Sequence, residues 1–68
     1  MLTFWETIEL LCEERHVTPK IMALRLSINV RTMRKWKYQG VIPRWETLVK
    51  LAEYFRVPRS YFLAYIKK

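Results

Sequence analysis

The stretch from Thr18 to Trp36, TPKIMALRLSINVRTMRKW, decides how this chain folds. Thr18 can cap a helix whose first residue is Pro19, a position where a missing backbone N–H costs nothing. Ser27 ends that helix, and Asn29 can cap the next one. The stretch therefore predicts two short helices that are joined by a tight turn.

The second of these helices, predicted over about residues 29–38, has two unlike faces. If Met33 points inward, Trp36 lies about 60° away on the same face, because successive residues of a helix are about 100° apart. Arg31 and Lys35 then both lie about 160° from Met33. One face is apolar and the opposite face is cationic, as expected for a helix that lies in the major groove of DNA.

Charge is spread unevenly along the chain. Residues 1–14 sum to −4, residues 15–45 carry eight basic and no acidic residues, and residues 46–68 sum to +3, which gives the net charge of +7. A solvated surface usually mixes both signs, so the long basic stretch predicts a polyanionic partner, most often nucleic acid. We expect this partner to be double-stranded DNA.

Size and composition exclude several other classes of protein. The 68 residues are 51% hydrophobic and are expected to form one domain over residues 1–68. The single cysteine can form neither a disulfide within the chain nor a metal cluster, which fits a reducing cytoplasm. We find no membrane span, no paired carboxylates in a plausible cleft and no nucleophile with a base. We therefore expect no enzyme, no metal and no cofactor.

The segments before and after this central stretch are also predicted to be helical. Thr3 and Glu6 form the pattern of a capping box at the start of a first helix. Further helices are predicted over residues 45–55 and about 59–66, and Gly40 is expected to end the central helix in a left-handed conformation. Because no segment alternates as a strand does, the predicted fold class is all-α, a bundle of five short helices.

The pattern of apolar residues resembles the Cro/phage-repressor helix-turn-helix family, also called the XRE family. The positions that carry the resemblance are Val17-Thr18, Met22-Ala23, Leu26, Ile28, Met33, Trp36, Pro43, Thr47-Leu48, Leu51-Ala52, Tyr54-Phe55, Val57 and Tyr61-Phe62-Leu63. The resemblance implies a lambda-repressor-like domain with its helix-turn-helix at about residues 18–37. It also implies a transcriptional regulator, bacterial or phage-encoded and nucleoid-associated, that binds operator DNA as a dimer.

Some positions depart from the pattern of that family. Ser27 stands where the turn usually has glycine, and Pro19 stands where a glutamine often contacts the DNA backbone. The family commonly pairs an arginine in the first helix with a glutamate after the tryptophan, and here these positions are Cys12 and Lys37. Both partners are absent together, so no buried charge is left alone.

Ten residues are candidates for contacts with DNA. The base-reading candidates are Asn29, Val30, Arg31, Arg34 and Lys35, because arginine and lysine can bond the guanine edge and valine can touch a thymine methyl. The phosphate candidates are Thr18, Lys20, Lys37, Tyr38 and Arg44. Capping alone could also explain Asn29, and phosphate contact alone could explain the basic residues.

An apolar surplus in the last predicted helix suggests a homodimer, formed at least on DNA. Its candidate interface consists of Tyr61, Phe62, Tyr65 and Ile66, of which the last two are expected to lie outside the core. Trp5 and Trp45 are expected to be surface-facing or half-buried.

Two other functions remain open from the sequence. The chain could be an antirepressor that binds another repressor protein through its last helix. Residues 30–36 followed by 40–43 are also similar to the MerR and excisionase winged-helix family, where a two-stranded hairpin should follow.

Overall fold

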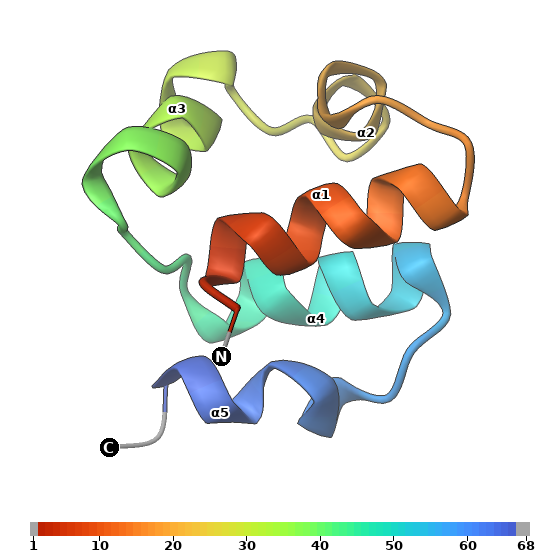
Figure 1. Ribbon diagram of the computed structural model, residues 1–68, viewed down its shortest axis with the longest axis vertical. Coiled ribbons are helices and arrows are strands. Elements are labelled where there is room, and N and C mark those ends of the chain that lie inside the picture. The colour runs from red at the N-terminus through yellow and green to blue at the C-terminus, as the bar shows by residue number, and fades with distance from the viewer. Residues whose placement is uncertain (1, 67–68) are drawn as a thin grey trace.

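The computed structural model describes residues 2–66, and only the backbone of residues 64 and 66. The chain forms α1 (Phe4–Glu14), α2 (Pro19–Arg25), α3 (Val30–Gln39), α4 (Trp45–Phe55), a 3-10 turn η1 (Arg59–Phe62) and α5 (Leu63–Ile66) (Figure 1). The described residues contain no strand, so the predicted all-helical class is confirmed.

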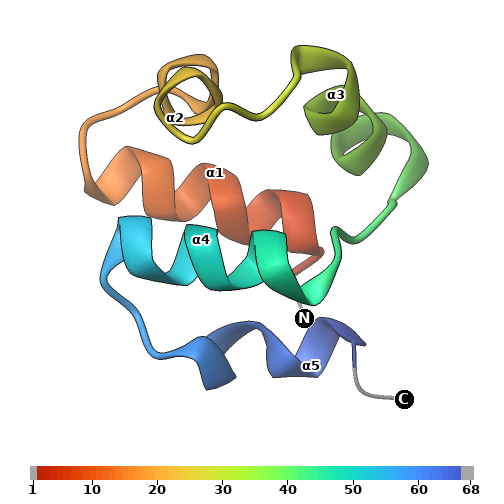
Figure 2. The ribbon, with the colours of Figure 1, turned by 180° about the vertical axis from the view of Figure 1, so that it is seen from behind.

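The helices form three layers. In both views α1 and α4 lie side by side in the middle, α2 and α3 cover one side of this pair, and α5 covers the other (Figures 1 and 2). The core between the layers includes Ile8, Met22, Leu51 and Phe55, all essentially inaccessible to solvent. The α2–α3 layer is therefore held on a rigid apolar base and turns its other side outward.

Local signals in the sequence explain where several elements begin and end. The capping box is present: the Glu6 carboxylate accepts from the Thr3 backbone N–H at 2.8 Å, and the Thr3 hydroxyl accepts from the Glu6 N–H at 3.1 Å. Gly40 ends α3 with φ 68°, as predicted. At the C-terminal end of α4, the Arg15 guanidinium donates a hydrogen bond to the carbonyl oxygen of Phe55. This position is favourable for a cation because the C-terminal end of a helix carries a partial negative charge.

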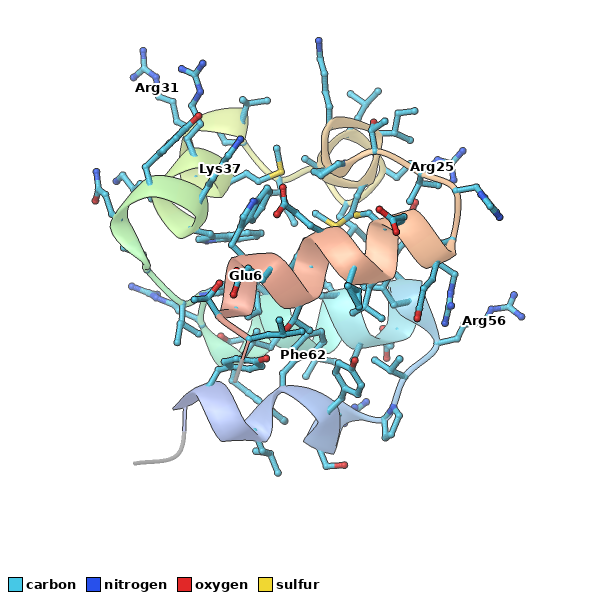
Figure 3. All side chains as sticks on the ribbon, viewed as in Figure 1. Glu6, Arg25, Arg31, Lys37, Arg56 and Phe62 are labelled. Atoms are coloured by element: carbon cyan, nitrogen blue, oxygen red, sulfur yellow. The ribbon has the colours of Figure 1, made fainter. Side chains whose placement is uncertain are left out.

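The C-terminal prediction needs correction. Residues 59–66 are helical, but they form η1 followed by the four-residue α5 rather than one α-helix. Phe62 is 0% exposed and packs edge-on against Phe4, so it belongs to the core and not to a free surface. Figure 3 shows this side chain between α5 and the middle layer. The core therefore contains an apolar side chain of the C-terminal segment that we expected to be free for a dimer contact.

Tyr65 was also expected to lie outside the core, and this expectation is wrong. Its ring is partly buried and lies edge-on to Phe4, with 5.6 Å between ring centroids. Its hydroxyl lies within hydrogen-bond distance of the Thr7 hydroxyl. The side chain of Ile66 lies outside the described part of the chain.

Two further expectations are settled by the fold. Trp5 is 9% exposed and belongs to the core, because it lies on the same side of α1 as Ile8, whereas Trp45 is partly exposed as predicted.

The segment after Pro43 forms α4, and residues 2–66 contain no hairpin. The winged-helix alternative therefore lacks its wing in the part of the chain that the structure describes.

Candidate nucleic-acid interface

The turn between α2 and α3 sets the position of both helices. The Thr18 hydroxyl caps α2 by accepting from the backbone N–H of Ile21 at 3.2 Å. After α2 ends, Ser27 adopts φ 58°, and the N–H of Ile28 bonds to the carbonyl oxygen of Ala23 at 2.8 Å. Ile28 packs against the core and so anchors the turn.

The two faces predicted for α3 are present. Met33 and Trp36 are its buried side chains, whereas the other residues of the helix are exposed. Arg31 and Lys35 lie about 40° apart around the helix axis, on the side away from the core. Figure 3 shows Arg31 extending away from the body of the molecule. We call this pair, Arg31 and Lys35, the crest of α3.

A first groove runs along one flank of the crest. It has a volume of about 420 Å³ and lies between α1, the start of α2 and α3. Its lining residues are Trp5, Glu9, Pro19, Lys20, Val30, Met33, Arg34, Lys37 and Tyr38. Five of the ten predicted contact residues, drawn from two helices, therefore meet in one groove. The Lys37 ammonium lies 5.2 Å from the centre of the Tyr38 ring, a cation–π distance.

A second groove of about 560 Å³ runs along the other flank of the crest. It is lined by Leu26, Ser27, Ile28, Asn29, Thr32, Trp36, Val41, Ile42, Pro43, Arg44, Thr47 and Lys50. Two predicted residues, Asn29 and Arg44, meet here with Thr47 and Lys50 from α4. The crest thus stands between two grooves, each of which carries basic side chains.

The sequence analysis did not place Thr47 and Lys50 beside Arg44 in this groove. Arg44 is the N-cap residue of α4 and has no side-chain capping bond, and Thr47 and Lys50 follow it at intervals of three residues. Residues three apart lie on one face of a helix, so this spacing was the signal that could have found them.

Two of the predicted contact residues, Thr18 and Asn29, also cap helices. The Asn29 amide oxygen accepts from the Arg31 N–H at 2.8 Å and so caps α3, as the sequence indicated. Thr18 caps α2 and borders a different hollow, beside Glu9 and Glu13. The structure therefore does not bring Thr18 into either basic groove.

The single cysteine, Cys12, is buried in the core. Burial, and then the nearby Glu9 carboxylate, raise the pKa of the Cys12 thiol to about 11, so this thiol stays protonated near neutral pH. Within residues 2–66, no group of three or more histidine, cysteine or acidic side chains could hold a metal ion. No helix among these residues is long and apolar enough to span a membrane.

The chain matches no family model, and no curated protein or solved structure is significantly similar to it.

Proposed function

We propose that this chain is a sequence-specific DNA-binding regulator of the phage repressor or Cro kind. In this proposal α2, its turn and α3 form a helix-turn-helix, and α3 is the recognition helix. The observation that carries the proposal is the crest of α3, Arg31 and Lys35, standing between two grooves with basic linings. A helix that enters the major groove needs base-reading side chains at its outermost edge and cations on both sides.

The arrangement separates the two kinds of contact. When α3 lies in the major groove, Arg31 and Lys35 face the base edges, where arginine can bond O6 and N7 of guanine together. The first groove then offers Lys20 and Lys37 to one phosphate backbone, and the second offers Arg44 and Lys50 to the other. Phosphate contacts set the register of the protein, and base contacts supply the specificity.

Selection of bound sequences from a random pool of double-stranded DNA tests the proposal. We expect one enriched sequence, bound with a strong dependence on salt. With four to six phosphate contacts, the slope of log K against log salt should be about −4 to −5 per bound copy. A slope near zero, or a pool without enrichment, would overturn the proposal.

Pairing of two copies on an operator belongs to the same proposal, because one recognition helix reads too few base pairs for useful specificity. Among the side chains that the structure describes at η1 and α5, the exposed apolar ones are Tyr61 and Leu63. We expect Tyr61→Glu with Leu63→Glu to keep the fold but to lose two-to-one binding. Unchanged two-to-one binding would place the pairing contact elsewhere.

The alternative of an antirepressor would use the same apolar side chains on another repressor protein. Phe62 and Tyr65 pack into this molecule, which leaves that surface smaller than the sequence suggested. The DNA selection separates the two functions, because an antirepressor would enrich no sequence.

A further inference from the structure

The outer face of α1 is both acidic and apolar. We call it the acidic stripe; its residues, which line a hollow of about 410 Å³, are Leu2, Glu6, Glu9, Leu10 and Glu13. The four of these that lie within α1 fall in an arc of about 100° around the helix. Leu2 is 47% and Leu10 is 49% exposed, and the stripe contains no basic residue.

The outer face of α2 has the opposite character. We call it the basic stripe; its residues are Lys20, Ile21, Leu24 and Arg25, which fall in an arc of about 140°. Leu24 is 81% exposed, the largest exposure of any large apolar side chain described, and Ile21 beside it is also exposed. No acidic residue lies on α2. Figure 3 labels Glu6 on the first stripe and Arg25 on the second.

The two stripes match each other in two independent ways. Each presents a pair of exposed aliphatic side chains, and their charges are opposite. Burial of an exposed leucine is favourable, and complementary charges around it fix the register of a contact and disfavour wrong partners. Neither aliphatic pair contributes to the core of its own molecule, so folding alone does not account for Leu10 and Leu24 being apolar.

We propose that the basic stripe of one copy docks on the acidic stripe of a second copy. Leu24 enters the hollow between Leu2 and Leu10, and Arg25 lies against the glutamates of the partner copy. The crest of α3 and the exposed pair Tyr61 and Leu63 take no part in this contact. It is therefore a self-association separate from the pairing proposed above, and it shares only Glu9 and Lys20 with the first groove.

Net charge explains why such a contact should be weak in the free protein. Each copy carries +7, so two copies repel each other at long range. At physiological ionic strength the Debye length is about 8 Å, which screens distant charges more than charges in contact. We therefore expect association between micromolar and millimolar concentration, and stronger association where DNA neutralises the basic residues of α3.

A charge swap at the two leucines tests the proposal by sedimentation velocity without DNA. Leu24→Glu places an acid against the acidic stripe, and Leu10→Lys places a base against the basic stripe. Each single variant should weaken self-association at least about tenfold, because like charges then face each other. The double variant Leu10→Lys with Leu24→Glu places opposite charges face to face at an unchanged net charge, and should restore association.

Every outcome decides the proposal. Loss in both single variants and recovery in the double variant supports it, whether association stops at a dimer or continues to larger species. It is overturned if the unaltered protein remains a monomer at millimolar concentration, if the single variants associate normally, or if the double variant fails to recover. Both leucines are exposed, so unchanged circular dichroism of all three variants serves as the control for folding.

Discussion

The hydroxyl oxygens of Tyr65 and Thr7 lie 2.5 Å apart, and this contact joins the last helix to the first across 58 positions of the sequence. Thr7 is 4% exposed, and its hydroxyl also donates to the Thr3 carbonyl oxygen at 3.1 Å. With that proton engaged, the phenol is the donor in the bond between the two side chains. The C-terminal segment is thus held by a specific polar contact as well as by the burial of Phe62.

Tyr65→Phe should therefore lower the free energy of unfolding by about 0.5–1.5 kcal/mol, because it removes one hydrogen bond and keeps the ring. Thr7→Val, which removes the partner hydroxyl at similar volume, provides the second arm of a double-mutant cycle. Urea unfolding followed by circular dichroism gives the four free energies. If the loss of stability in the double variant equals the sum of the losses in the two single variants, the two hydroxyls do not interact, and this outcome would contradict the hydrogen bond.

The ends of α1 and α3 could be predicted from the sequence because interactions between neighbouring residues determine them. Caps and turns depend on a few neighbouring residues, and for this reason the capping box at Thr3, the cap at Asn29 and the left-handed Gly40 were all predicted. The two faces of α3 follow from helical periodicity alone. These features place the crest and much of the first groove.

The remaining features depend on contacts that are distant in the sequence. Nothing near Phe62 indicates that Phe4 will cover it, and nothing near Arg15 indicates that it will reach the carbonyl of Phe55. Trp5 was misplaced for the same reason, since the depth of a helix face depends on what packs against it. Charge counting included Arg15 in the basic stretch, but its guanidinium caps α4, away from the crest.

Ser27→Gly should stabilise the protein. Ser27 has φ 58°, a conformation that costs a residue with a Cβ about 1–2 kcal/mol, whereas glycine adopts it freely. The greater freedom of glycine in the unfolded chain offsets part of this gain, so we expect a net increase of about 0.5–1 kcal/mol. Thermal unfolding measures the change, and Ser27→Ala, which keeps the strain, should show no gain. A destabilised glycine variant would show that the serine side chain makes a stabilising contact.

The stability of the protein should fall at alkaline pH in a way that depends on Cys12. Burial, with a contribution from Glu9, raises the thiol pKa from its ordinary 9.0 to about 11. Below pH 9 both the folded and the unfolded chain hold the proton, and the contribution of the thiol to stability is complete. As the pH rises through 9 toward 11, the unfolded chain loses its proton first and is favoured, by at most about 1.4 kcal/mol per pH unit.

Cys12→Ala isolates this effect from the titration of lysine and tyrosine side chains. The variant leaves a small cavity and should be less stable below pH 9, but the difference from the parent protein should shrink between pH 9 and 11. Urea unfolding over this range measures the difference. A constant difference would contradict the raised pKa.

Arg31→Ala and Lys50→Ala should weaken DNA binding in different ways. Arg31 belongs to the crest, so its loss should cost about 1–3 kcal/mol on the selected site and relax the preference at one base pair. Lys50 lines the second groove beside Arg44, so its loss should weaken binding to all sequences alike and reduce the salt slope by about 1. Titrations of each variant with the selected site and a scrambled site, at several salt concentrations, separate the two effects.

Arg56→Gly is the matched control, because it removes one positive charge at a site away from the proposed interface. Figure 3 shows Arg56 at the end of the molecule opposite Arg31. Arg56 has φ 58°, a conformation that suits glycine, so the control should not destabilise the fold. We expect it to keep both the affinity ratio between the two sites and nearly the full salt slope. If Arg31→Ala retains full discrimination, or if Arg56→Gly weakens binding as much as Lys50→Ala does, then net charge and not the crest and its grooves governs the interaction with DNA.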